Sequence, residues 1–284
     1  MKIVQKSSLL RNDLSAFRRK GGLVGFVPTM GALHEGHLSL VRRAKVENDR
    51  VVVSIFVNPL QFGPKEDLKK YPRDLKKDAK LLSGLCDFLF IPQKDRMYPA
   101  DFCSNVEVKA LSDIHCGLSR KGHFAGVATI VAKLFNIVSP DNAYFGQKDA
   151  QQAVIIKKMV DDLNFPIKVH VLPTVRESDG LAMSSRNIYL SDKERREAVV
   201  LYQALKSAER MVAGKERDTE KIRMVLVDFI KRVPSARIDY VDVVDAKSLL
   251  PVKTINGTAL LLLAVYIGKT RLIDNTILKI RQSA

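Results

Sequence analysis

Residues 23–37 read LVGFVPTMGALHEGH, and this stretch decides the fold. Its first part, 23–27, is a short apolar run that stops at Pro28. An amphipathic pattern begins at Gly36, so the stretch predicts a strand, a loop and then a helix. Ligands of an open α/β sheet bind beyond the carboxyl ends of its strands, which makes the loop 28–37 the first candidate for a functional site.

The same alternation of strand and helix continues along the chain. The near-continuous apolar run 51–57, rich in β-branched residues, predicts a strand buried on both faces of a parallel sheet. Further strands are predicted at 87–91, 142–146 and 168–172, and further helices at 75–82, 127–138 and 150–163. Strands that alternate with helices over this length indicate an α/β fold, a Rossmann-like doubly wound parallel sheet.

The pattern changes after Pro173. Residues 191–194, Ser-Asp-Lys-Glu, have the form of a capping box and predict a helix that continues to about Lys215. A second helix is predicted at 218–232, with strands at 238–244, 259–267 and 271–277, the last two joined around Gly268. These elements predict a smaller C-terminal α+β domain with an antiparallel sheet. We therefore expect two domains, residues 1–174 and residues 175–284.

Charge and composition narrow the choice of function. The 47 basic residues against 31 acidic ones give a net charge of +16, which would attract phosphates, nucleotides or nucleic acid alike. The basic residues are spread over the whole chain, and only 7% of the residues are aromatic. A nucleic-acid-binding protein is therefore a less favoured alternative, and we expect no nucleic acid partner.

The sequence shows no targeting signal and no membrane span. The amino terminus lacks the apolar core of a secretory signal. The longest apolar run, 259–267, is about half of the roughly 20 residues that a helix needs to cross a bilayer. The cysteines show no C-x-x-C spacing and are typical of ordinary thiols in a reducing compartment. We expect a cytoplasmic protein with no membrane partner.

The loop 28–37 has the features of a phosphate-binding site. Gly31 and Gly36 let the backbone approach a ligand closely, and the start of the helix offers N–H groups and a positive dipole end. His34 and His37, three residues apart on a first turn, face the same way and can donate to phosphate oxygens. A zinc site of the His-Glu-x-x-His type is disfavoured, because the histidines have the wrong spacing and the segment opens a helix. Two surface histidines without a function are the simpler alternative for an isolated pair.

Three further polar stretches follow predicted strands or the domain boundary, at residues 58–63, 146–149 and 183–186. Lys148 and Arg186 suit the charge of a phosphate. Serine hydroxyls and backbone N–H groups in the third stretch can donate to the same oxygens. Each stretch taken singly is equally consistent with a polar loop that binds nothing.

Taken in order, several motifs resemble those of the pantothenate synthetase family. They lie at residues 28–37, 56–63, 71–74, 122–127, 148–152 and 184–187. The resemblance covers nearly the whole chain. It implies a Rossmann-like nucleotidyltransferase domain, related to class I aminoacyl-tRNA synthetases, that binds ATP and pantoate. It also implies a mobile C-terminal lid domain that closes over ATP, and a homodimer.

The resemblance further implies an AMP-forming ligase of pantothenate biosynthesis, the route to coenzyme A. Such an enzyme condenses (R)-pantoate with β-alanine through a pantoyl-adenylate, with ATP as a substrate and Mg²⁺ as a cofactor. The alternative is a nucleotidyltransferase of the same superfamily that attaches AMP or CMP to a phosphorylated small molecule. That enzyme would share the loop 28–37 with its two histidines, called the histidine loop below, but would lack the pantoate-binding pair Gln61 and Gln152.

Individual residues take their expected roles from the resemblance. His37 is expected to act as a general acid, with His34 as its phosphate-binding neighbour and Lys148 as a third catalytic residue. The ATP site is expected to comprise Met30, Gly31, Ala32, Leu33, His34, Glu35, Gly36, His37, Gly146, Gln147, Lys148, Asp149, Val175, Met183, Ser184, Ser185 and Arg186. Gln61 and Gln152 are expected to hold pantoate, Gln61 also to lie near β-alanine, and Asn58 and Arg120 to support the substrates. No side chain is assigned to the metal.

Overall fold

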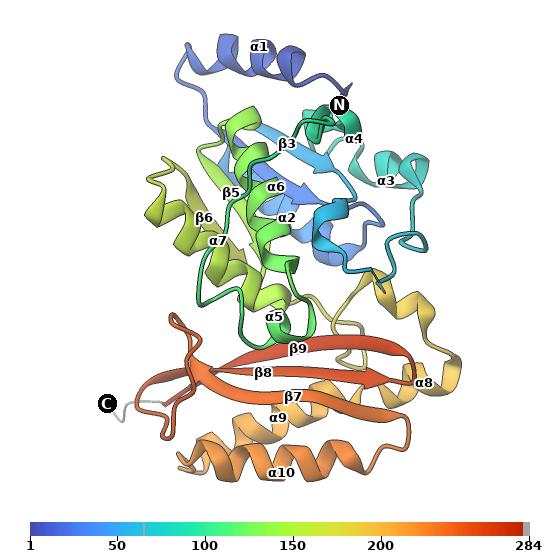
Figure 1. Cartoon of the computed structure of the whole chain (residues 1–284), viewed down its shortest axis with the longest axis vertical. Coiled ribbons are helices and arrows are strands. Elements are labelled where there is room, and N and C mark those ends of the chain that lie inside the picture. The colour runs from blue at the N-terminus through green and yellow to red at the C-terminus, as the bar shows by residue number, and fades with distance from the viewer. Residues whose placement is uncertain (65, 281–284) are drawn as a thin grey trace. The chain divides into compact units, whose positions relative to one another are not determined.

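The computed structural model describes residues 1–64 and 66–280 (Figure 1). The chain divides into two compact units, the first comprising residues 1–147 with 151–173 and the second 148–150 with 174–284. Across the described ranges, no helix combines the length and the apolar content that crossing a bilayer requires.

The first unit contains a six-stranded sheet in which neighbouring strands are parallel. Its strands are β1 (Lys2–Val4), β2 (Val24–Thr29), β3 (Arg50–Ile55), β4 (Phe88–Phe90), β5 (Asn142–Gly146) and β6 (Lys168–Leu172), in the order β1-β4-β3-β2-β5-β6. Its helices are α1 (Ser7–Arg18), α2 (Glu35–Glu47), α3 (Leu75–Leu82), α4 (Lys94–Met97), α5 (Cys116–Ser119), α6 (His123–Val138) and α7 (Ala150–Asp162, whose first residue is assigned to the second unit), with the 3₁₀ turn η1 (Pro59–Gln61). A second 3₁₀ turn, η2 (Gln147–Asp149), begins in the first unit, and its last two residues are assigned to the second. The predicted doubly wound parallel sheet is confirmed.

Both faces of this sheet are covered, which explains why its strands are almost continuously apolar. Val27 and Val53 pack with Val41 of α2 in one core cluster. The neighbouring residue Phe26 points to the opposite face, because side chains alternate along a strand. There it meets Phe135 of α6 edge to face, with ring centroids 6.3 Å apart.

The strand order reverses at β2, which lies between β3 and β5. All six residues of β2 pair with β3, but only Gly25 and Phe26 pair with β5. The ladder between β2 and β5 therefore ends before the carboxyl end of β2. Ligands of doubly wound sheets bind at such a switch point, and the histidine loop begins there.

The second unit contains a three-stranded antiparallel sheet of β7 (Ala236–Asp245), β8 (Thr258–Ile267) and β9 (Thr270–Lys279). The helices α9 (Val200–Ala213) and α10 (Thr219–Lys231) pack against it in one hydrophobic core, and α8 (Asp192–Glu197) and the 3₁₀ turn η3 (Ser185–Tyr189) precede them. The predicted hairpin is confirmed, with Gly268 at φ +57° in its turn. The smaller α+β fold expected for this part is therefore present.

Two features of the fold differ from the prediction. The continuous helix expected from residue 191 to Lys215 is wrong, because α8 ends at Glu197 and α9 begins at Val200. Ala198 (φ −61°, ψ −21°) and Val199 (φ −62°, ψ −18°) form a tighter turn of 3₁₀ character. Neither residue is a helix breaker, so the sequence carries no local sign of this turn. The elements β1, α1, α4 and α5 were not predicted.

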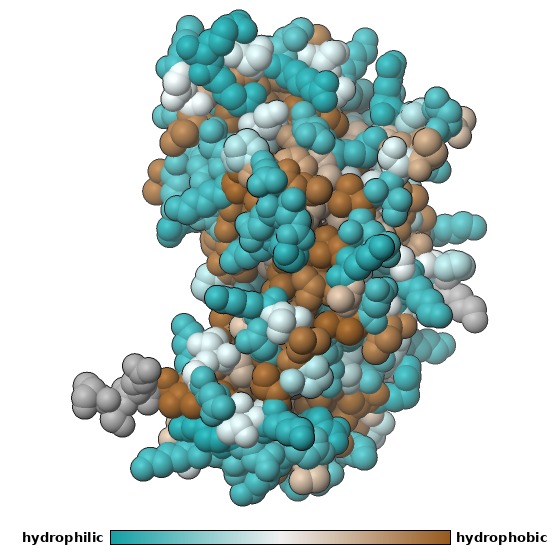
Figure 2. All heavy atoms as spheres, turned by 60° about the vertical axis from the view of Figure 1, so that its left-hand side comes forward, coloured by the Kyte–Doolittle hydropathy of each residue, from teal (hydrophilic) through white to brown (hydrophobic). Residues whose placement is uncertain are grey.

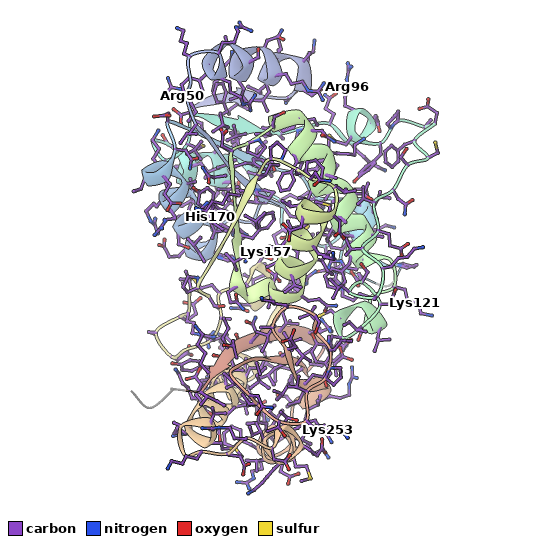
Figure 3. The ribbon with its side chains drawn as sticks, turned by 90° about the vertical axis from the view of Figure 1, so that its left-hand side faces the viewer. Arg50, Arg96, Lys121, Lys157, His170 and Lys253 are labelled. Carbon is purple, nitrogen blue, oxygen red and sulfur yellow. The ribbon has the colours of Figure 1, made fainter. Side chains whose placement is uncertain are left out.

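Charged side chains are dispersed over the surface, as their spread along the sequence indicates. Figure 3 labels four arginine and lysine residues of the first unit, which lie well apart. They are Arg50 in β3, Arg96 in α4, Lys121 just before α6, and Lys157 in α7. Figure 2 likewise shows hydrophilic side chains distributed over the visible face. The labelled cations therefore do not form one basic patch.

Candidate functional site

The loop between β2 and α2 is held in a tight turn by local hydrogen bonds. The Thr29 hydroxyl donates to the Ser54 carbonyl (2.8 Å) and accepts from the Gly31 N–H (3.2 Å). Gly31 has φ +83°, and a Cβ atom built on it would lie 3.0 Å from Oδ2 of Asp78. Glycine is required at this position both by the backbone conformation and by the nearby carboxylate.

Asp78 of α3 supports the loop by accepting hydrogen bonds from its backbone. This residue was not predicted from the sequence. Its carboxylate is 2% exposed and accepts the N–H groups of Ala32 (2.9 Å) and Leu33 (2.8 Å). Burial raises the pKa of Asp78 above its ordinary value, although the two backbone N–H groups act in the opposite direction. The available signal was an acid four residues before Leu82, on the same face of α3.

The two histidines lie together at the tip of α2. The His34 ring accepts the Gly36 N–H at Nδ1 (3.2 Å), and the His37 ring accepts the His34 N–H at Nδ1 (3.4 Å), so they form a capping box. The ring centroids are 4.1 Å apart. Because both Nδ1 atoms accept, the proton of each neutral ring is on Nε2. Two N–H donors at a positive helix end are suited to an anionic ligand.

Gly36 is the residue that permits this cap. A Cβ atom there would lie 2.9 Å from both Cε1 and Nδ1 of His34, so Gly36→Ala is expected to displace the His34 ring. Loss of the cap costs about 1 kcal/mol, and the gain in helix propensity is of similar size, so the melting temperature should hardly change. If the loop acts in catalysis, the rate of turnover should fall about tenfold, the effect of about 1.4 kcal/mol in the barrier. In the control Gly63→Ala, whose Cβ would meet no atom closer than 3.8 Å, the rate should not change.

The turn after β3 brings Gln61 to the histidine loop. Nε2 of Gln61 lies 2.8 Å from Sδ of Met30. Asn58, 1% exposed, donates to Oε1 of Gln61 (3.1 Å) and to the Gly126 carbonyl (2.9 Å). Its own Oδ1 accepts the Tyr98 hydroxyl (2.8 Å) and the backbone N–H of residue 60 (3.3 Å). The Asn58 amide is thus fully engaged within the protein, which favours a supporting role.

Arg120 also lies beside this turn, and Gln152 lies on α7. Arg120 forms a two-point ion pair with Glu66, at 2.7 Å for each contact. The adjacent Gln151 is buried and holds the 111–116 segment, accepting from one backbone N–H and donating to two carbonyls. Gln152 is half-buried, and within residues 1–64 and 66–280 its amide has no hydrogen bond. This difference favours Gln152 over its neighbour as a ligand-binding residue.

The remaining predicted residues fall in two places. Gly146 ends β5 and Gln147 follows it, both in the first unit. The second unit contains Lys148, Asp149, Val175, Met183, Ser184, Ser185 and Arg186. Nζ of Lys148 lies 3.5 Å from Oδ1 of Asp149, and the Lys148 carbonyl accepts from Nδ2 of Asn275 (3.0 Å). The Ser184 hydroxyl accepts the Arg186 N–H (3.2 Å) and caps η3.

A buried ion pair that was missed in the sequence fixes the segment 175–183 within the second unit. Arg176 donates to both carboxylate oxygens of Asp274 in β9, at 2.6 and 3.0 Å, and the Asp274 side chain is 1% exposed. The guanidinium also lies over the Tyr202 ring, 4.8 Å from its centroid. Beyond it, the Met183 N–H donates to the Val175 carbonyl (3.0 Å). The signal was an acid in the alternating pattern of this strand, on the same face as Leu272 and Leu278.

Comparison with known proteins identifies the family. The chain matches the family model described as pantoate-beta-alanine ligase over residues 2–277. Pantothenate synthetase of Pelotomaculum thermopropionicum is 55% identical over 279 residues, covering 98% of this chain and 99% of that protein. The enzyme of Moorella thermoacetica is 52% identical over 281 residues, covering 99% of each.

Solved structures agree with this. The crystal structure of pantothenate synthetase from Thermus thermophilus has a TM-score of 0.92 at 46% identity and covers 97% of this chain and 99% of its own. The structure of pantoate-beta-alanine ligase from Francisella tularensis, complexed with beta-gamma ATP and beta-alanine, has a TM-score of 0.80 at 36% identity, covering 98% and 97%. The fold, the motifs and these similarities together show that the chain is a ligase and belongs to the pantoate-beta-alanine ligase family.

Proposed function

We propose that the protein condenses (R)-pantoate with β-alanine at the expense of ATP, through a pantoyl-adenylate, and releases AMP and pyrophosphate. Family membership supports the overall reaction, and the Francisella tularensis relative is a complex with an ATP compound and β-alanine. The observation that carries the proposal is the pair of imidazoles, with their Nε2 donors, at the switch point of the sheet.

The reaction has two steps and needs no protein nucleophile. In the first, a carboxylate oxygen of pantoate attacks the α-phosphorus of ATP and expels pyrophosphate, which leaves a mixed anhydride. In the second, the amine of β-alanine attacks the acyl carbon, loses a proton and expels AMP. Amide formation is thereby coupled to cleavage of the nucleotide.

The protein's task is to orient the reactants and to stabilise the charge that develops on phosphate oxygens. We assign this to His34 and His37, whose Nε2–H groups are set by the hydrogen bonds at Nδ1. His37 additionally supplies a proton to the leaving pyrophosphate. Gln61 and Gln152 hold pantoate through their amides. The ATP contacts of Lys148 and of residues 183–186 in the second unit stay predictions from the resemblance.

Mg²⁺ is proposed to enter with the nucleotide. Among the described residues, no group of three or more His, Cys, Asp or Glu side chains is arranged to hold a metal ion. Mg²⁺ in nucleotide sites takes many of its ligands from phosphates and water, so this chain fits an ion that is carried by ATP. When bound, the ion neutralises charge on the phosphate oxygens. We also propose, on the resemblance, a cytoplasmic homodimer in which residues 175–284 act as a lid over the adenylate, beside the nucleotide- and pantoate-binding domain 1–174.

One assay tests the proposed reaction. ATP and pantoate are supplied with or without β-alanine, and pyrophosphate and AMP are followed. We expect a burst of pyrophosphate, one per site, that requires pantoate but not β-alanine, followed by AMP release only when β-alanine is added. Steady pyrophosphate release without β-alanine would mean that the adenylate is exposed to water and would contradict the lid. Release that requires a phosphorylated acceptor in place of pantoate would identify the alternative nucleotidyltransferase.

A further inference from the structure

We infer that His123 is a positioning residue that holds the backbone of Gln61, and that Arg120 acts through this histidine and through Gln61 instead of binding substrate itself. The inference rests on the proposed function, because Gln61 is the proposed ligand of pantoate. It assigns a part of the reaction to residues that do not touch the reacting atoms.

The hydrogen bonds around His123 fix one tautomer of its ring. His123 begins α6 and is buried, with Nδ1 2.7 Å from the Gln61 carbonyl oxygen and Nε2 2.9 Å from Nη1 of Arg120. A carbonyl oxygen only accepts, so Nδ1 carries the proton. A guanidinium only donates, so Nε2 is the acceptor. This is the opposite tautomer to that of His34 and His37.

Arg120 is held in turn by Glu66. Its Nε and Nη2 atoms each donate to one carboxylate oxygen at 2.7 Å, and Nη2 also lies 3.3 Å from the Gln61 carbonyl oxygen. Burial raises the pKa of Glu66, but hydrogen bonds and the charge of Arg120 outweigh it and keep the pKa below its ordinary value. Glu66 therefore stays ionised at neutral pH. A guanidinium engaged in this way has little capacity left for a substrate carboxylate.

These contacts hold Gln61 at both ends. The backbone carbonyl of Gln61 accepts hydrogen bonds from His123 and Arg120. Its side-chain oxygen accepts one from Asn58, and its Nε2 lies next to Sδ of Met30 in the loop 28–37. The start of α6 can approach the turn only because residue 126 is glycine, where a Cβ atom would lie 2.3 Å from a carbonyl oxygen of the turn. A ligand-binding amide that is already oriented binds its substrate with less loss of side-chain freedom.

Two substitutions separate the two hydrogen bonds of the ring. His123→Asn places an amide N–H where Nδ1 stands and keeps the donor to Gln61. His123→Gln reaches the position of Nε2, keeps a partner for Arg120 and loses that donor. We expect His123→Gln to raise KM for pantoate about tenfold, the effect of one lost buried hydrogen bond, with KM for ATP unchanged. His123→Asn should keep KM for pantoate close to the wild-type value.

The controls distinguish positioning from packing. Lys121, exposed and directed outward in Figure 3, gives the matched variant Lys121→Gln, which should match the wild type in every constant. Similar melting temperatures for both His123 variants, with different KM values, support the inference. Equal KM values in the two variants, or equal losses that follow a common drop in melting temperature, would overturn it.

A spectroscopic measurement tests the tautomer independently of catalysis. Nitrogen-15 NMR of the histidine rings in the whole protein should show a signal from a ring protonated at Nδ1 that is absent in His123→Gln. A ring protonated at Nε2 at this position would refute the geometry. If the wild type forms no pantothenate, the proposed function fails, whereas the tautomer assignment is still decided by this spectrum.

Discussion

Replacing His37 by alanine is expected to lower pantoate-dependent pyrophosphate release about 100-fold to 1,000-fold while leaving the fold intact. One pre-placed donor at a developing negative charge contributes about 3 to 4 kcal/mol to the barrier. The hydrogen bond that the His37 ring accepts from the His34 N–H is long (3.4 Å), so its loss alone should cost little stability. The initial burst of pyrophosphate and the melting temperature are the two measurements.

The variants His37→Gln and His34→Ala serve as controls. Glutamine reaches the position of Nε2 with an N–H donor and should recover part of the rate. His34→Ala should lose both rate and about 1 kcal/mol of stability, because this ring also caps α2 through the Gly36 N–H. A near-normal burst of pyrophosphate in His37→Ala would contradict the role of this residue as a hydrogen-bond donor to phosphate and as a general acid.

Replacing Asp78 by alanine is expected to reduce both stability and activity. The change leaves the buried N–H groups of Ala32 and Leu33 without their carboxylate acceptor, at a cost of about 1 to 3 kcal/mol for each group. Removing a buried charge offsets a part of this cost, so we expect a net loss of about 2 to 4 kcal/mol in the free energy of unfolding. The loop should also lose its fixed geometry, and kcat/KM should fall at least tenfold. Urea unfolding and steady-state kinetics measure the two effects.

Two comparisons locate the cause. Asp78→Asn keeps the shape but offers one acceptor oxygen where two are needed, so its losses should be intermediate. Asp74→Ala removes the N-cap of the same helix, where the carboxylate accepts the Lys77 N–H (3.0 Å), and should cost about 1 kcal/mol without slowing the reaction. Equal kinetic losses at positions 74 and 78 would mean that the helix matters and the loop contact does not.

The sequence was sufficient for the elements that carry strong periodic patterns. Strands β5 and β6 begin and end where predicted, because apolar runs are bounded there by loop residues. The three residues of β1 pair only with β4, and α1 buries only Leu10 and Leu14, so both patterns are too weak to recognise. The turn between α8 and α9 lies in helix-compatible residues and was invisible for the same reason.

The residues that support the site were harder to find than those of the motifs. Asp78 contacts a residue 45 positions away, Arg120 contacts one 54 positions away and Arg176 one 98 positions away. Such pairs depend on the folded topology, and the sequence around one partner does not indicate which residue the other partner is. The motif residues could be named from the sequence, because two glycines and two histidines lie at a predicted strand-to-helix turn, and their roles stay predictions.

Adjacent residues of one strand connect two of the segments proposed to bind nucleotide. Asp274 of β9 receives Arg176 and so fixes the residues that lead to Met183, while Asn275 donates to the carbonyl of Lys148. Two segments that are about 30 residues apart in the chain are therefore bound by neighbouring residues of the same strand. Because neighbouring residues of a strand have a fixed separation, the backbone at Lys148 and the side chain of Arg176 are anchored one residue apart on the same strand.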